Sequence, residues 1–209
     1  MGNYKDDLME QFADKGNGNH YYVDSPMEAR KVFQEQLGGT LEVIAKDVKL
    51  QVDFDPEQVA RYRLVGYENR DIADADFRDD KVDAGEIGAG HTVTALYELE
   101  LRPGAGDGLA TVRVRAKLPQ GSVAEEAAFR FSARALATSF DASNRDLRFA
   151  TAVMGAAEIF RRSPHARDWS YDQVMRIARG ATPEGNAERE EFVELLQQAR
   201  AIVTRVASR

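Results

Sequence analysis

The sequence predicts an α+β fold, in which an antiparallel β-sandwich core follows a short helix–strand–helix segment and precedes a C-terminal segment of three helices. Apolar residues recur at helical spacing up to residue 37, alternate with polar residues from residue 40, and return to helical spacing beyond residue 141. Turns, not helix-length crossovers, separate most of the alternating stretches, which is typical of antiparallel sheets. We therefore expect three regions, with boundaries at 1–37, 38–140 and 141–209.

The chain begins with residues that predict a helix and then a short strand. Asn3 can cap the helix and Gly16 is placed to end it, because glycine tolerates the left-handed backbone of a helix C-terminus. Residues 20–23 (His-Tyr-Tyr-Val) follow a glycine–asparagine turn and predict the strand. One side of the helix carries Leu8, Met9 and Phe12.

A second helix is predicted from residue 25. Ser25 as N-cap, Pro26 in the first turn and Glu28 three residues after the cap form a capping box. A lone strand between two helices cannot bury a core, so we expect residues 1–37 to be the end of a longer domain. We also expect the 21–23 edge to pair with another sheet edge. The apolar stripe of the second helix comprises Ala29, Val32, Phe33 and Leu37.

Six stretches with a period of two predict the strands of the core. Asp55-Pro56 ends the second stretch, because proline cannot donate a hydrogen bond to a sheet ladder. The predicted strands span residues 41–45, 48–54, 60–67, 92–101, 110–118 and 127–135.

Three helices are predicted after residue 141. Ser163-Pro164 ends the first, Ser170 with Gln173 forms a capping box for the second, and the third follows Pro183. The first helix should bury Leu147, Ala150, Met154, Ala157 and Phe160. The third should bury Phe192, Leu195, Leu196, Ala199, Ile202, Val203 and Val206.

Composition excludes several classes of function. Hydrophobic residues make up 43% and charged residues 30% of the chain, as in ordinary globular proteins. The chain has no cysteine, so disulfides and thiolate sites are excluded. The net charge of −7, without a basic face in either part, disfavours a nucleic-acid partner. No apolar run is long enough to span a bilayer.

The acidic loop (residues 71–83, from Asp71 to Asp83) is the strongest candidate for a metal site. Its aspartates are the hard oxygen ligands that Ca²⁺ prefers. The spacing of an EF-hand is absent, however, and Arg78 and Lys81 dilute the negative charge. We expect a solvated loop. A divalent-cation (Ca²⁺) binding domain, or an enzyme that uses this loop, remains the alternative.

Other reactive residue types lack a catalytic pattern. Gly85, Gly88 and Gly90 lead through His91 into a predicted strand, whereas a dinucleotide fingerprint leads into a helix, so we expect a turn or bulge there. Members of adjacent glutamate pairs diverge in a strand or helix, and no Gly-x-Ser-x-Gly motif occurs. We therefore predict no catalytic, cofactor-binding or metal-ligating residue. The isolated histidines are His20 and His165, and the glutamate pairs are Glu125-Glu126 and Glu190-Glu191.

Aromatic residues flank the start of the second C-terminal helix. Trp169 and Tyr171 are expected to pack onto the next layer of the fold, as aromatic residues at a helix entry usually do. Arg161-Arg162 is expected to complement the dipole at the end of the preceding helix.

Several stretches resemble one bacterial family. Residues 2–10 and 13–19 are similar to the end of a von Willebrand factor type A domain, with 21–24 matching its last strand and 28–33 its closing helix. The later stretches resemble the uncharacterised region that follows this domain in a family of bacterial cell-envelope proteins. They are residues 62–70, 83–98, 149–150, 170–171 and 179–181.

The resemblance implies a role for the chain but no metal site. Type A domains hold a cation through an Asp-x-Ser-x-Ser motif, which this chain lacks. Residues 141–145 come nearest, but Arg145 takes the last place, and we expect residues 141–144 to cap a helix. The family implies a non-catalytic interaction or scaffold module in the bacterial cell envelope or periplasm. Its partner would be another protein or the type A domain in cis, and the N-terminal remnant of that domain could also form a homo-oligomer.

Overall fold

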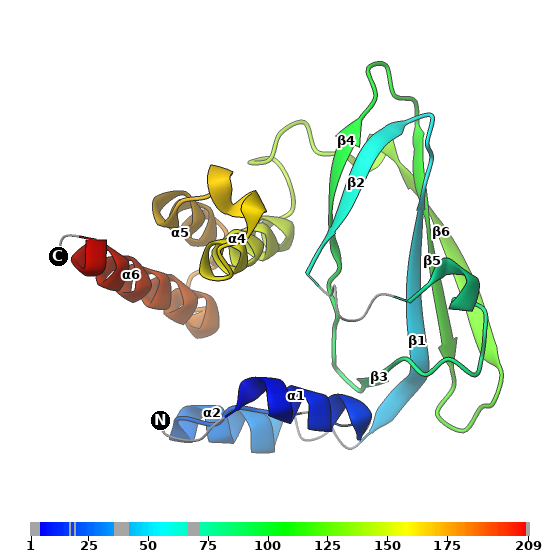
Figure 1. The fold of residues 1–209 in the computed structure, drawn as a ribbon, viewed down its shortest axis with the longest axis horizontal. Coiled ribbons are helices and arrows are strands. Elements are labelled where there is room, and N and C mark those ends of the chain that lie inside the picture. Colours follow the sequence, from blue (N-terminus) through cyan, green and yellow to red (C-terminus); the bar gives the residue numbers. More distant parts are fainter. Residues whose placement is uncertain (1–4, 17, 19, 36–41, 67–71, 208–209) are drawn as a thin grey trace. The chain divides into compact units, whose positions relative to one another are not determined.

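The computed structural model describes residues 5–16, 18, 20–35, 42–66 and 72–207 (Figure 1). Its backbone divides into two compact units, Met1–Ala133 and Arg134–Arg209, which we call the sheet unit and the helical unit. With 39% of residues helical and 26% in strands that pair antiparallel, the structure confirms the predicted α+β class.

The described residues of the N-terminal segment form helices but no strand. Helix α1 spans Asp6–Lys15, and α2 spans Pro26–Arg30 and continues as a π-helical turn over Lys31–Glu35. The Oγ of Ser25 accepts a hydrogen bond from the backbone N–H of Glu28 at 3.1 Å, so the predicted cap is confirmed. The strand prediction for residues 20–23 was wrong, because aromatic and β-branched residues favour extended backbone but do not supply a partner strand. Asn3 and Leu37 lie outside the described residues.

The main sheet is antiparallel with the strand order β3-β1-β5-β6 (Figure 1). Its strands are β1 (Val43–Phe54), β3 (Gly85–Gly88), β5 (Gly108–Lys117) and β6 (Ala124–Ser132). A second antiparallel sheet pairs β2 (Val59–Val65) with β4 (Leu96–Leu101). Phe54 of β1 packs on both strands of this second sheet, with ring centroids 4.6 Å from Tyr62 and 5.4 Å from Tyr97.

Three strand predictions needed correction. The predicted strands 41–45 and 48–54 are one strand, β1, in which the irregularity between Lys46 and Lys49 contains Asp47 at a φ of 50°. The predicted strand 92–101 begins only at Leu96. Strand β3 was missed, because three of the six residues from Gly85 to Gly90 are glycines, which have low β-propensity and indicate a turn instead.

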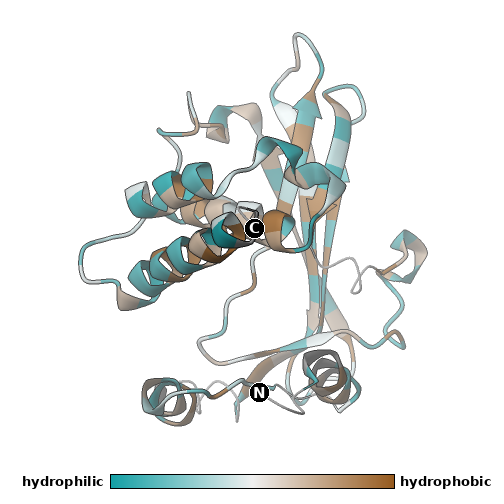
Figure 2. Cartoon of the chain, turned by 60° about the vertical axis from the view of Figure 1, so that its left-hand side comes forward, coloured by the Kyte–Doolittle hydropathy of each residue, from teal (hydrophilic) through white to brown (hydrophobic). Residues whose placement is uncertain are grey.

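The helical unit contains α4 (Arg145–Phe160), α5 (Tyr171–Gly180) and α6 (Ala187–Ala207), with a 3₁₀ turn, Pro164–Asp168, after α4. Figure 2 shows hydrophilic and hydrophobic residues on different sides of these helices. Side-chain oxygens of Asn144 and Ser170 accept hydrogen bonds from the first turns of α4 and α5. The core of the unit comprises Ala152, Ala156, Val174, Met175, Ala178, Val193 and Leu196.

The buried helix faces differ from those predicted. Helix α4 buries Ala152, Gly155 and Ala156, whereas Leu147 and Phe160 are exposed. The six-membered ring of Trp169 lies so close to Gly155 that a Cβ at this position would overlap it. Small residues allow this close approach. A prediction of the buried face that is based on large apolar residues does not detect them. In α6 the prediction was right for Leu196, which is buried, but it missed the buried Val193, and Leu195, Ile202 and Val203 are exposed.

Candidate functional site

One face of the main sheet carries a row of cationic side chains. Because successive side chains of a strand point to opposite faces, Arg113, Arg115 and Lys117 of β5 share one face. The antiparallel register places Lys49 of β1 opposite Arg115, and Gln51 opposite Arg113. These five residues define what we call the polar face.

The acidic loop is bound to the polar face through its backbone as well as its side chains. Lys49 is only 4% exposed, and its Nζ donates to the main-chain oxygens of Asp76 at 3.3 Å and Asp79 at 2.5 Å. The Nε2 of Gln51 donates to Oδ1 of Asp74 at 3.0 Å. Phe77, which is 5% exposed, adds an apolar anchor. Most side chains of the loop are exposed, as expected for a solvated loop, but the segment is also anchored to the sheet by a buried lysine and a buried aromatic ring.

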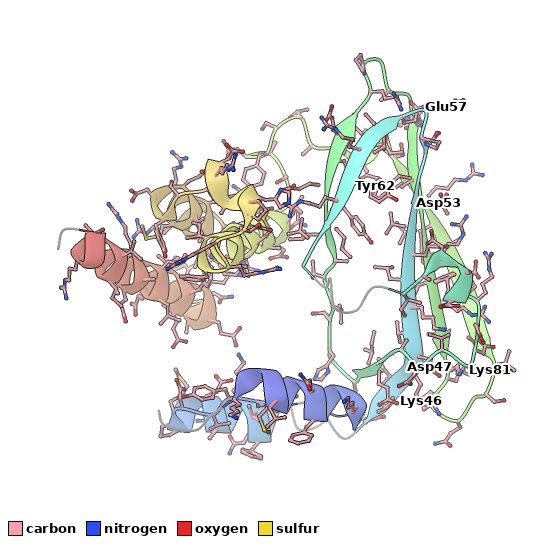
Figure 3. The ribbon with its side chains drawn as sticks, viewed as in Figure 1. Lys46, Asp47, Asp53, Glu57, Tyr62 and Lys81 are labelled. Atoms are coloured by element: carbon pink, nitrogen blue, oxygen red, sulfur yellow. The ribbon has the colours of Figure 1, made fainter. Side chains whose placement is uncertain are left out.

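Two ion pairs fix the end of the acidic loop. The carboxylate of Asp80 lies 2.9 Å from Nη2 of Arg115. Lys117 Nζ lies 2.6 Å from the carboxylate of Asp47 and donates to the main-chain oxygen of Asp80 at 2.8 Å. Asp47 also accepts a hydrogen bond from the backbone N–H of Ala84 at 3.3 Å. Figure 3 shows Asp47 and Lys81 towards the same end of the sheet, opposite the end that carries Glu57.

A further ion pair ties the acidic loop to the edge strand β6. Arg78 donates through Nε and Nη2 to the two carboxylate oxygens of Glu126, at 2.9 and 2.8 Å. This bidentate geometry is the strongest form of an arginine–carboxylate contact. Arg113 and Arg115 add weaker contacts with Glu126 at 3.9 and 3.8 Å. The acidic loop is thus connected to β1, β5 and β6.

These contacts keep the carboxylates ionised. The hydrogen bond from Lys117 is the main cause that lowers the pKa of Asp47, and the one from Arg115 lowers the pKa of Asp80. The hydrogen bonds from Arg78 lower the pKa of Glu126, which in turn raises the pKa of Arg78. At neutral pH the polar face and these carboxylates therefore form a network of opposite charges.

A network of this kind stabilises a fold and is poorly suited to calcium. Asp74 and Asp80 are occupied by Gln51 and Arg115, and the adjacent cationic side chains oppose a second positive charge. Within the described residues, no group of three or more histidine, cysteine, aspartate or glutamate side chains is placed to hold a metal ion. Asp71 lies outside the described residues.

The other residues considered in the sequence are scattered. The backbone N–H of His91 donates to the oxygen of Gly88 at 3.1 Å, and Gly90 has a φ of 80°, so the predicted turn is confirmed. His20 precedes α2, and His165 lies in the 3₁₀ turn after α4. The glutamate pairs lie in β6 and α6, and within the first pair Glu126 opposes Arg115 while Glu125 opposes Ala116.

Sequence reasoning identified the acidic loop but missed its cationic partners. Lys49, Arg115 and Lys117 lie in strands about 30 to 40 residues from the loop, and only the fold brings them together. The alternation Arg113-x-Arg115-x-Lys117 could have predicted these partners, because it places three positive charges on one face of a strand. A charged face on a central strand requires a charged cover.

Two shallow hollows lie among the described residues. One, of about 420 Å³, lies in the sheet unit between Phe54, Tyr62 and Arg102. The other, of about 360 Å³, lies in the helical unit and includes Arg148 and Arg176. In the described part of the chain, no helix has the length and apolar character needed to cross a membrane.

Comparison with known proteins places most of the chain in one group. Residues 39–202 match the family model described as the C-terminal part of the uncharacterised protein YfbK. The chain is 34% identical, over 219 aligned positions, to the uncharacterised protein YfbK of Escherichia coli (strain K12). The alignment covers 94% of this chain and 37% of that relative, so the chain spans little more than a third of the relative's length. No solved structure matches the chain.

Proposed function

The chain belongs to the family of the uncharacterised YfbK C-terminal domain, and from this membership we propose that it is a non-catalytic interaction module accompanying a von Willebrand factor type A domain. The module would support or orient that domain in the bacterial cell envelope. Its partner would be the type A domain of the same polypeptide or another protein.

The observation that carries the proposal is the exposed apolar surface of the N-terminal helices. Phe12 of α1 is 64% exposed, Met27 of α2 is 67% exposed, and Phe33 in the following turn is 63% exposed. Burying a side chain of this size contributes about 1.5–3 kcal/mol, so amphipathic helices normally pack such residues against a partner. These residues precede residue 39, where the family match begins. This supports the idea that they belong to a neighbouring domain, which we propose, from the resemblance, to be of type A.

The polar face supports a structural role for the sheet unit. Its cationic groups are neutralised by neighbouring carboxylates, as in the pairs of Arg115 with Asp80 and Lys117 with Asp47. General acid–base catalysis needs a group whose pKa lies near the working pH, whereas the pKa values of Asp47, Asp80 and Glu126 are lowered. A sheet whose charges are neutralised within the unit suits a support better than a catalyst.

Hydrogen exchange tests the proposal on the Escherichia coli relative, compared as the full-length protein and as the segment that aligns with this chain. The region matching α1 and α2 should exchange slowly in the full-length protein and much faster in the segment, because only the longer protein supplies the packing partner. Equal exchange in both would contradict the proposal. Light scattering of the segment identifies self-association as a competing explanation for any protection.

Two variants of this chain provide a matched control. Phe33→Ser should leave the unfolding transition of the chain unchanged, because the ring is already exposed. Val32→Ser should lower the midpoint temperature of unfolding, because Val32 is buried.

A pull-down from cell-envelope extract, with and without the preceding region, then separates a partner in cis from another protein. Calorimetric titration with Ca²⁺ tests the alternative, since heat and a raised melting temperature would support a cation-binding domain.

A further inference from the structure

The hollow in the helical unit is built around two arginines from neighbouring helices. Arg148 lies in the first half of α4, and Arg176 lies in the middle of α5. The remaining lining residues are Phe140, Asp141, Ile177 and Gly180. The volume of about 360 Å³ is sufficient for a small organic anion.

Both guanidinium groups lack a partner in the described part of the chain. No hydrogen bond or ion pair involves the side chain of Arg148 or Arg176 there. Two other arginines of the same unit are paired: Arg189 lies 2.5 Å from the carboxylate of Asp146, and Arg200 lies 2.6 Å from that of Asp172. Carboxylates therefore neutralise some arginines elsewhere in the unit, whereas the two arginines of the hollow are not neutralised in this way by any described residue.

The Nε of Arg148 adds a second, independent observation. This atom is buried and has no hydrogen-bond acceptor. Buried donors in native proteins are almost always satisfied, and a buried donor without an acceptor is destabilising. The guanidinium is a fork of donors whose planar geometry matches the oxygens of a carboxylate or phosphate. An oxyanion in the hollow would supply the acceptor that Arg148 lacks.

We propose that the hollow between α4 and α5 binds an oxyanion-bearing ligand, a phosphate ester or a carboxylic acid, through Arg148 and Arg176. Phe140 and Ile177 line the same hollow and suit a ligand that carries an apolar group beside its anionic one. The inference goes beyond the proposed interaction module and stands independently of it, since it concerns only the helical unit.

Asp141 sets the balance of charge in the hollow. Its carboxylate has no ion-pair partner among the described residues, and it repels an incoming anion. The same carboxylate is the only acidic group among the lining residues that could turn towards an arginine when no ligand is bound. Removing its charge should therefore strengthen the binding of an anion.

Titration with inorganic phosphate at constant ionic strength, followed by NMR chemical shifts, tests the proposal. We expect saturable binding with shifts centred on α4 and α5. Because each charge-assisted hydrogen bond contributes substantially, Arg148→Gln and Arg176→Gln should each weaken binding about tenfold or more. Asp141→Asn should strengthen binding several-fold. Phenyl phosphate should bind more tightly than phosphate, because its ring can contact Phe140 and Ile177.

Arg167→Gln is the matched control, since it removes the same charge from an exposed position outside the hollow. It should change the phosphate affinity by less than about twofold, because Arg167 does not line the hollow and acts on the ligand only through solvent. The Arg176 variant keeps the test decisive if the partly buried Arg148 variant fails to fold. Non-saturable shifts, or equal weakening by all three arginine variants, would overturn the proposal. So would weaker binding by Asp141→Asn.

Discussion

Each of the two units of this protein is stabilised internally by a different kind of interaction. The helical unit packs α4, α5 and α6 around an apolar cluster, in which Ala152, Ala156 and Ala178 allow close helix contacts and Leu196 is the largest buried side chain. The sheet unit covers one face of its main sheet with the acidic loop, which is held by Lys49, Arg115 and other charged or polar groups. The difference teaches that a regular fold can be completed by packing nearby helices or by pairing distant charges.

The largest expected effect lies in the apolar cluster. Leu196→Ala should destabilise the helical unit by about 2–5 kcal/mol, because it removes a fully buried side chain and leaves a cavity. Chemical denaturation followed by the fluorescence of Trp169, the single tryptophan, measures this unit directly. Leu195→Ala on the exposed side of α6 is the control and should have little effect. Equal losses for the two variants would refute the assigned face of α6.

A smaller effect is expected from overpacking the same cluster. Gly155→Ala places a methyl group where the six-membered ring of Trp169 now lies, and should destabilise the unit by about 1–3 kcal/mol. Near-ultraviolet circular dichroism should show a displaced indole. Gly180→Ala is the matched control, because nothing lies within 4 Å of a Cβ at that position. A neutral Gly155→Ala variant would mean that the ring moves aside freely.

The polar face should respond to the loss of its buried lysine. Lys49→Met keeps most of the side-chain volume but removes the donor that satisfies the main-chain oxygens of Asp76 and Asp79. The expected cost is about 1–3 kcal/mol, with faster hydrogen exchange in residues 72–83. Lys46→Met on the same strand is the control. If exchange in these residues stayed slow, the clamp between Lys49 and the acidic loop would be excluded.

The smallest effect on stability per residue is expected from acid. This response also distinguishes the two units most clearly. Asp47, Asp80 and Glu126 have lowered pKa values in the folded sheet unit. Their contribution to stability is therefore complete above the unfolded pKa values, about 3.9 for aspartate and about 4.3 for glutamate. It is lost as the pH falls below about 4 and through the lowered folded values.

Urea unfolding at a series of pH values measures this response. Asp47→Asn should be less stable than the native chain at pH 7, and the difference should shrink as the pH falls, because the native Asp47 then becomes neutral as well. A pH-independent difference would show that the charge of Asp47 contributes nothing.

The parts of the fold that were predictable depend on short-range chemistry. The cap at Ser25, the cap at Ser170 and the turn at Gly88–Gly90 each arise within a few residues, and all three are present. The strand predicted at residues 20–23 failed because a strand requires a partner, which no local pattern supplies. The face of α4 was predicted incorrectly, since the contact of Gly155 with Trp169 depends on tertiary packing. In α6 the prediction was right for Leu196 but wrong for Leu195, Ile202 and Val203.

The candidate sites followed the same division. The acidic loop stood out by composition, yet its partners were set by pairings such as Arg115 with Asp80, which are 35 residues apart. The hollow with Arg148 and Arg176 had no sequence signal at all. The two arginines line one hollow only because α4 and α5 pack together, and arginines on helix surfaces are too common to single out.

The hydrogen bonds of Lys49 have a consequence for how this family can diverge. Its Nζ recognises the main-chain oxygens of residues 76 and 79, which every amino acid provides. Substitution of the Asp76 side chain therefore leaves that attachment intact, whereas a deletion that shifts the loop by one residue breaks it. During evolution, amino-acid substitutions in this segment should therefore be tolerated, whereas changes in the length of the segment should be restricted.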